Sequence, residues 1–249
     1  MSEIMLEYVP LLHHLEALYR MPRDMARFKT YIGSILNAQG DDVEIPPLVV
    51  ANPMAREHAL EYVQKLLELG AEEVAARATE AAARRLPPTG LKVSLMVLDD
   101  ARGGWTSRHT TVGSLWSLEG RALARWKRSA WVTVPCWTSE PPSPEQIRRE
   151  TLRVLHQSVW AMHRPLPKDL RTILEFEGQA MRFAETEQWM EAEELEYTWA
   201  VIEPLSAAAD HPTLSAALYG DPVAYSLGYP PLGLSKNAGL ALALHLASS

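Results

Sequence analysis

Residues 91–98 read LKVSLMVL, and they are followed directly by DDARGGWTSRHTT at residues 99–111. The first stretch is a short apolar run bounded by Pro87-Pro88 before it and by a glycine-containing polar stretch after it, which predicts a strand followed by a loop. A second strand is predicted at residues 130–137, AWVTVPCW, because valines, threonine and tryptophans are enriched in strands. We therefore expect a small sheet in the N-terminal half.

The sequence TSEPPSP at residues 138–144 breaks this pattern, and mostly helical patterns follow it. We place a boundary there, between a mixed α/β lobe at residues 1–138 and a helical lobe at residues 139–249 that share one core. Helices are predicted at 144–163, 169–184 and 188–202. In the last of these, an apolar stripe is formed by Trp189, Ala192, Leu195, Trp199 and Ile202. The fold class expected from this order is α+β, helix-dominated, with the sheet packed against the C-terminal half.

In two further segments the positions of the prolines indicate the local structure. Residues 45–51, IPPLVVA, are read as a short strand whose paired prolines suit an edge or a strand start. Residues 221–234 are rich in proline and glycine and are read as a loop.

Composition excludes several classes of protein. The chain has 249 residues, 47% of them hydrophobic and 22% charged, which is typical of a folded protein and not of a disordered or collagen-like one. A single cysteine, Cys136, excludes an intrachain disulfide and is expected to lie in a strand core. The N-terminal residues lack the basic start of a signal peptide, and no apolar run reaches the length of about 20 residues that spans a bilayer. We expect a soluble cytoplasmic protein with no membrane partner.

Charge is distributed unevenly along the chain. Residues 175–196 hold eight glutamates and one arginine, and the formal net charge of the whole chain is −7. Residues 101–137 instead combine arginines and one lysine with five tryptophans. This combination resembles the composition of single-stranded nucleic acid binding surfaces, but no RNA-binding motif accompanies it. We therefore favour strand tryptophans that pack inward with arginines facing water, and we do not predict a nucleic acid partner.

The polar loop at residues 99–111 is a candidate binding site. Its adjacent glycines, Gly103 and Gly104, allow close approach of backbone, and its hydroxyls and arginines suit a carboxylate or a phosphate. The residues predicted to hold such a ligand are Arg102, Thr106, Ser107, Arg108 and His109. A solvated loop without a ligand explains the same residues equally well.

Glu177 is the one acidic residue predicted to lie in an apolar face. At about 100° per residue, leucine, isoleucine, alanine and methionine side chains of the helix at 169–184 surround it. An unpaired carboxylate in a core is costly, so Glu177 needs a partner or a raised pKa.

The preceding helix offers that partner in His156, with His163 further along it. Glu177 and His156 are candidate catalytic residues, and Glu177, His156 and His163 are candidate ligands of a divalent metal such as zinc. A structural interpretation, in which a histidine, a hydroxyl or a water satisfies a buried glutamate, is the simpler one.

The sequence HQSVW at residues 156–160, followed downstream by Glu177, resembles the layout of zincin metalloproteases, in which H-E-x-x-H precedes a glutamate ligand. Gln157 stands at the position of the general base and Trp160 at that of the second histidine. The two residues that are replaced, the glutamate general base and the second histidine, carry the chemistry of the family, so the resemblance implies a similar layout and not an active protease.

Two classes of function follow from these observations. The first is a hydrolase-like site, or a pocket for a metal or a small molecule, between the two lobes. The second is a non-catalytic binding or interaction protein that uses the basic, tryptophan-rich segment and the acidic helix, with a second copy of the chain as one partner.

Overall fold

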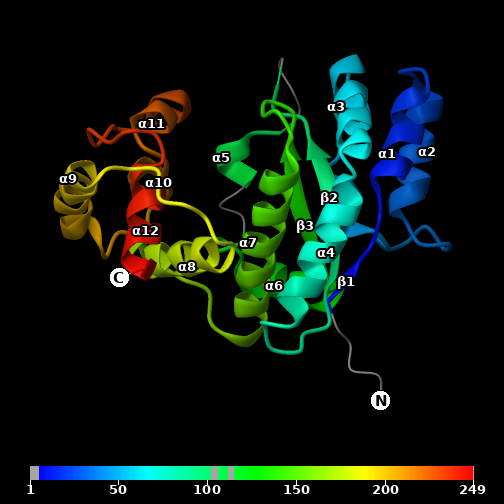
Figure 1. Ribbon diagram of the computed structural model, residues 1–249. Coiled ribbons are helices and arrows are strands. Elements are labelled where there is room, and N and C mark those ends of the chain that lie inside the picture. The colour runs from blue at the N-terminus through cyan, green and yellow to red at the C-terminus, as the bar shows by residue number, and fades with distance from the viewer. Residues whose placement is uncertain (1–5, 102–105, 112–114, 249) are drawn as a thin grey trace. The chain divides into compact units, whose positions relative to one another are not determined.

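The computed structural model describes residues 6–101, 106–111 and 115–248, and these form two compact units (Figure 1). The first unit contains the chain up to residue 111 together with residues 119–162. The second contains the segment that ends at Leu118 and everything from His163 onward. The molecule is a helix-dominated α+β protein with a small sheet in its N-terminal half, so the predicted fold class is confirmed.

The first unit alternates helices with three short strands in its described residues. In chain order its elements are β1 (Glu7–Tyr8), α1 (Leu12–Arg20), α2 (Met25–Ile35), the 3-10 helix η1 (Pro46–Val50), α3 (Glu57–Glu68), α4 (Ala71–Ala83), β2 (Lys92–Leu98), α5 (Arg108–Thr111), α6 (Gly120–Ser129), β3 (Trp131–Trp137) and α7 (Pro144–His163). All of α7 except His163 belongs to this unit, although α7 begins after the break that marks the boundary predicted from sequence.

The described strands form one parallel sheet in the order β1-β2-β3. The register pairs Lys92 with Trp131 and Leu98 with Trp137, so the paired strands end at the same level. Every residue of β2 from Val93 onward is buried. A parallel strand covered on both faces needs apolar residues at successive positions, which explains why LKVSLMVL lacks an alternating pattern.

Helices α3 and α4 and the 3-10 helix η1 pack against this sheet, and α1 packs against α3. The buried face of α1 consists of Leu12, Leu15, Leu18 and Tyr19, at the spacing expected of an amphipathic helix. Asp24 begins α2 by accepting hydrogen bonds from the backbone amides of Ala26 and Arg27.

The stretch at 99–111, predicted as a loop, ends in helix α5. Two further predictions of local structure are wrong, both at prolines. Residues 46–50 form the 3-10 helix η1 and not a strand, because prolines at its first two positions have the fixed φ of a helix start and cannot donate to a sheet. Residues 221–227 form helix α11 (Asp221–Leu227) and not a loop, with Pro222 in its first turn. Gly228 ends α11 in the left-handed conformation that favours glycine.

The second unit is helical in its described residues. Besides α11 it contains α8 (Leu170–Phe183), α9 (Ala192–Ile202), the 3-10 helix η3 (Glu203–Leu205), α10 (His211–Tyr219) and α12 (Ala238–Ser248). Helix α12 packs on α8, α9 and α10 (Figure 1). Helices α8 and α12 lie close together at Gly178 of α8, where a β-carbon would overlap the backbone carbonyl of Ala243 in α12.

The core of the second unit draws on all of its α-helices. Its buried members include Leu170, Ile173, Leu174, Met181, Leu195, Ile202, Leu214, Leu218, Val223 and Leu242. Leu195 and Ile202 are buried as predicted, whereas Trp189, Ala192 and Trp199 are exposed. Helix α9 begins only at Ala192, so Trp189 precedes it, and Trp199 lies away from the buried side.

No helix among the described residues combines the length and the apolar character that crossing a bilayer requires.

Candidate functional site

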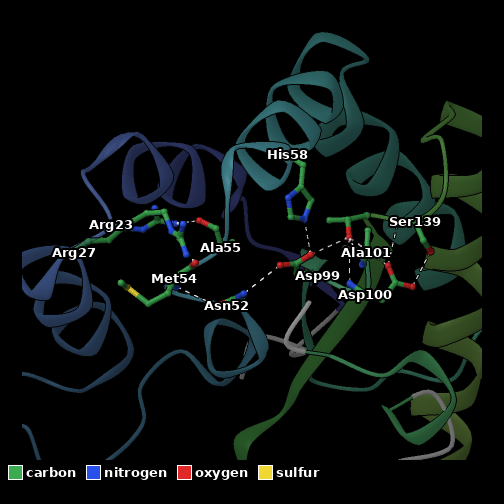
Figure 2. Close-up of polar contacts among 11 residues, drawn as sticks. Arg23, Arg27, Asn52, Met54, Ala55, His58, Asp99, Asp100, Ala101 and Ser139 are labelled. Atoms are coloured by element: carbon green, nitrogen blue, oxygen red, sulfur yellow. Dashed lines mark hydrogen bonds and ion pairs between the residues drawn. The ribbon is translucent and has the colours of Figure 1, made fainter. Parts of the chain in front are cut away.

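Polar residues follow strands β2 and β3 of the first unit. Asp99 and Asp100 come directly after β2, and Thr138 and Ser139 come directly after β3. Because Leu98 is paired with Trp137, these four residues meet at one edge of the sheet, which we call the carboxyl edge. Figure 2 shows Asp99, Asp100 and Ser139 at this edge. In open sheets with parallel strands, ligands bind outside this edge.

Asp99 is the most enclosed of the acidic residues at the carboxyl edge. Its carboxylate lies 2.7 Å from Nε2 of His58 and accepts hydrogen bonds from Nδ2 of Asn52 at 3.1 Å and from Oγ1 of Thr138 at 3.3 Å. The side chains of Asp99 and His58 are only 4% and 11% exposed. An ionised carboxylate can only accept a hydrogen bond, so next to it Nε2 of His58 is the donor, and in the neutral form of the ring Nδ1 then carries a lone pair.

Asp100 joins the ends of the two strands. Its carboxylate accepts hydrogen bonds from the amide of Ser139 at 2.9 Å and from the Ser139 hydroxyl at 2.7 Å. The hydroxyl oxygen of Thr138 in turn accepts from the amides of Asp100 and Ala101, both at 3.2 Å (Figure 2). These reciprocal bonds satisfy the backbone where the strands stop pairing.

Arg108, at the start of α5, faces the same acidic groups. Its guanidinium forms an ion pair with Glu140, lies 3.6 Å from the carboxylate of Asp100 and stacks over the ring of Trp137 at 4.9 Å. Three nearby polar atoms have no hydrogen-bond partner within the described part of the chain, namely Nε and Nη2 of Arg108 and Oγ1 of Thr106. The amide of Thr106 donates to the carbonyl of Asp99 at 3.0 Å, so both residues border the carboxyl edge.

Two arginines of the first unit hold the loop that carries Asn52. Arg23 donates to the carbonyl of Met54 at 3.2 Å, and Arg27 donates to the carbonyl of Ala55 at 3.2 Å (Figure 2). The Arg27 guanidinium lies 4.9 Å from the centre of the Tyr19 ring. Arg27 is 1% exposed, and this burial lowers its pKa. The loop is thus fixed by Asp99 at one end and by arginines at the other.

Cys136 lies in β3 with its side chain in the core, as predicted. Burial raises the pKa of its thiol to about 12, because the charged thiolate is disfavoured away from water. A thiol in this environment is not a nucleophile near neutral pH. Burial also raises the pKa of Tyr62 in α3.

The residues of the predicted binding loop divide into two groups. Thr106 and Arg108 lie at the carboxyl edge, as the contacts above show. Ser107 is exposed and His109 is half-buried in α5, while Arg102 lies outside the described residues. The prediction that all five bind one ligand stays a prediction.

Glu177 is buried on α8 with 4% of its surface exposed, as the helical pattern predicts. It lies in the second unit, whereas His156 lies in the part of α7 that belongs to the first. His156 is half-buried with its ring 6.3 Å from that of Trp160, and His163 is exposed at the end of the same helix. Glu177 and His156 thus lie in different units, and their catalytic role stays a prediction.

The predicted zinc site gains no support from the structure. Within residues 6–101, 106–111 and 115–248, no group of three or more His, Cys, Asp or Glu side chains is arranged to hold a metal ion. His156 and His163 are two helical turns apart, about 10 Å along the axis of α7, and not the single turn that brings two histidines together. The ligand set of Glu177, His156 and His163 stays a prediction.

The pair of His58 and Asp99 is absent from the candidates derived from sequence. These residues are 41 positions apart, and no local pattern links them. The available signal is the repeated occurrence of polar residues after a predicted strand, Asp99-Asp100 and then Thr138-Ser139. This signal points to one edge only once the two strands are known to be parallel.

Comparisons of the chain with protein-family models, with curated proteins and with solved structures found no match.

Proposed function

We propose that the carboxyl edge of the sheet in the first unit is a hydrolase-like site for a small molecule, with His58 as its general base. The observation that carries this proposal is the 2.7 Å contact between Nε2 of His58 and the enclosed carboxylate of Asp99. A carboxylate in this position fixes the tautomer and orientation of the imidazole and stabilises the imidazolium that forms when the ring takes up a proton. Asn52 and Thr138 hold the carboxylate in place.

The proposed ligand carries an oxyanion, either a carboxylate or a phosphate. Nη2 of Arg108 and Oγ1 of Thr106 are the donors that support this choice, because neither has a partner in the described part of the chain. Guanidinium and hydroxyl donors are well suited to anionic oxygens. Both residues belong to the loop in which the sequence predicts such a ligand.

In the proposed reaction, Nδ1 of His58 takes a proton from a water molecule as its oxygen attacks the acyl carbon or the phosphorus of an ester. The bond to the leaving oxygen then breaks, and the imidazolium returns its proton to that oxygen. The products are an acid and an alcohol, and the enzyme regains its starting protonation state.

The test compares His58→Gln with wild-type protein on two anionic esters, the mono-p-nitrophenyl ester of succinate and p-nitrophenyl phosphate. Glutamine can still donate to Asp99 but cannot act as a base, so turnover should fall by about 10²- to 10⁴-fold while urea unfolding changes little. His14→Gln on α1 is the matched control, because His14 is exposed and lies on a different helix. Unchanged turnover in His58→Gln, or no turnover of either ester by the wild-type protein, would contradict the proposal.

A second candidate function is favoured by helix α6. No residue of α6 is buried, and it carries Arg121, Arg125, Lys127 and Arg128 with no acidic residue inside the helix. Leu123 and Trp126 are only half-buried, so the helix exposes cations beside apolar surface. A non-catalytic interaction protein would use such a helix to bind an acidic partner, including the glutamate-rich α9 of a second copy.

A further inference from the structure

The second unit contains a pocket that is separate from the carboxyl edge of the sheet. It has a volume of about 410 Å³ and is lined by residues of α8, α9, η3 and α12 and by Ser206. Leu174, Ile202 and Ala243 are the buried residues among those that line it. A volume of this size falls in the usual range for small-molecule sites.

Two large apolar side chains of this pocket are open to water. Trp199 of α9 is 42% exposed and Leu246 of α12 is 46% exposed, and both line the pocket. The apolar pattern of the sequence predicts Trp199 in the core, but its ring is exposed at the pocket. An apolar ligand bound there would remove this apolar surface from water. Together with the buried residues, these side chains suit an aromatic or branched aliphatic group.

The charged residues of the pocket are two glutamates and one arginine, which gives it a formal charge of −1. Arg171, Glu175 and Gln179 follow one another at one-turn spacing along α8, and Glu203 comes from η3. Gln179 donates to the carboxylate of Glu175 at 3.2 Å. Across the described residues, neither Glu175 nor Glu203 takes part in an ion pair with any Lys, Arg or His, even though Arg171 lines the same pocket.

The surrounding charges also favour a cation. Helix α9 continues directly into η3, which ends next to Ser206 of the pocket, so the C-terminal carbonyls of this helical segment contribute partial negative charge there. The N-terminus of α8, which carries partial positive charge, is capped by the carboxylate of Asp169. An ammonium group beside Glu175 and Glu203 would also lie near the indole of Trp199, whose face attracts cations.

We propose that this pocket binds a small organic amine, with its apolar body against Trp199 and Leu246 and its ammonium group facing Glu175 and Glu203. The proposal is independent of the hydrolase-like site, because every residue that lines the pocket belongs to the second unit.

The first experiment uses three probes that share one apolar body and differ in charge. Phenethylamine, 2-phenylethanol and 3-phenylpropionate are titrated into the full chain, and binding is followed by ligand-observed NMR. The amine should bind tightest and the carboxylate weakest, and methylamine, which lacks the apolar body, should not bind. Equal binding of amine and carboxylate, or no binding of the amine, would overturn the proposal.

The second experiment places the binding site. Glu175→Gln/Glu203→Gln should weaken phenethylamine binding by about fivefold to tenfold, as expected when two partly exposed charges are lost. Glu193→Gln/Glu196→Gln removes the same charge from exposed positions of α9 outside the pocket and should have a much smaller effect. Equal weakening by the two double variants would overturn the assignment of the ammonium group.

A tryptophan pair completes the test. Trp199→Ala should weaken binding several-fold, whereas Trp189→Ala should not, because Trp189 is equally exposed but does not line the pocket. Both residues are exposed, so both variants should fold, and thermal unfolding checks this directly. Unchanged binding in Trp199→Ala would overturn the placement of the apolar body.

Discussion

The thiol of Cys136 links the stability of the first unit to pH. Burial raises its pKa from 9.0 to about 12, so the folded chain holds this proton more tightly than the unfolded chain does. The contribution of this bound proton to the free energy of unfolding is fully present below pH 9 and is lost as the pH rises toward 12. By pH 10 this one group should lower the free energy of unfolding by about 1 kcal/mol relative to pH 8.

This prediction is tested by urea unfolding of wild-type protein and Cys136→Ala between pH 8 and pH 10. The variant should lose less stability over this range, because its side chain has no proton to release. Tyr19 and Tyr62, whose pKa values burial also raises, keep part of the slope in both proteins. Identical pH dependence in the two proteins would show that the thiol is not enclosed as described.

At the residue scale, the sequence predicts burial better than it predicts partners. The apolar face of one helix is enough to place Glu177 inside, and the apolar run of one strand is enough to place Cys136 there. The partners of Asp99 come from three separate segments, since Asn52 precedes α3, His58 lies in α3 and Thr138 follows β3. Such contacts depend on tertiary packing, which local periodicity does not encode.

At the scale of elements, substitution of glycine by alanine is predicted to change stability in opposite directions at two positions. Gly178→Ala should destabilise the second unit by about 2 kcal/mol or more, because the added methyl group overlaps the carbonyl of Ala243 and forces α8 and α12 apart. Gly33→Ala in α2 should instead stabilise by about 0.5 to 1 kcal/mol, since nothing lies near its β-carbon position and alanine is the better helix former.

Thermal and urea unfolding of the two variants measure these effects directly. Gly33 serves as the control for Gly178 because both glycines lie inside helices of the described chain. Stabilisation by Gly178→Ala would mean that α8 and α12 do not cross as closely as described.

Helices and strands were predictable from sequence where a continuous pattern defined them. The strand at 92–98 and the helices at 144–163 and 170–183 agree with their apolar patterns to within one or two residues. Proline confounds the prediction at η1 and α11, because the same residue suits a strand edge, a loop and a helix start. The two residues of β1 were not predicted, since a strand this short carries no pattern of its own.

At the scale of the whole molecule, the opposite charges of α6 and α9 predict salt-dependent association of the chain. If α6 binds α9 of a second copy, sedimentation should show dimers at low salt and monomers at high salt, because exposed charges are screened beyond about 8 Å at physiological ionic strength. A monomer at both salt concentrations would contradict self-association.

Two charge variants locate the surface responsible. Arg121→Ser/Arg125→Ser on α6 should abolish the dimer, since both arginines are exposed on the helix proposed to bind. Arg77→Ser/Arg84→Ser removes the same charge from exposed positions in or next to α4 and should leave the dimer intact. Loss of the dimer in both variants would point to the net charge of the chain and not to α6.

The make-up of the second unit has a consequence for the order in which the two units fold during synthesis. Trp116 packs against the core of this unit, with its ring 6.5 Å from that of His211. A ribosome makes Trp116 long before α8, α10 and α12, and it makes α6, β3 and α7 of the first unit in between. Domains generally fold as units from the N-terminus during synthesis. If the first unit folds as soon as it is synthesised, it does so before the core that Trp116 packs against is complete, because α8, α10 and α12 are synthesised later.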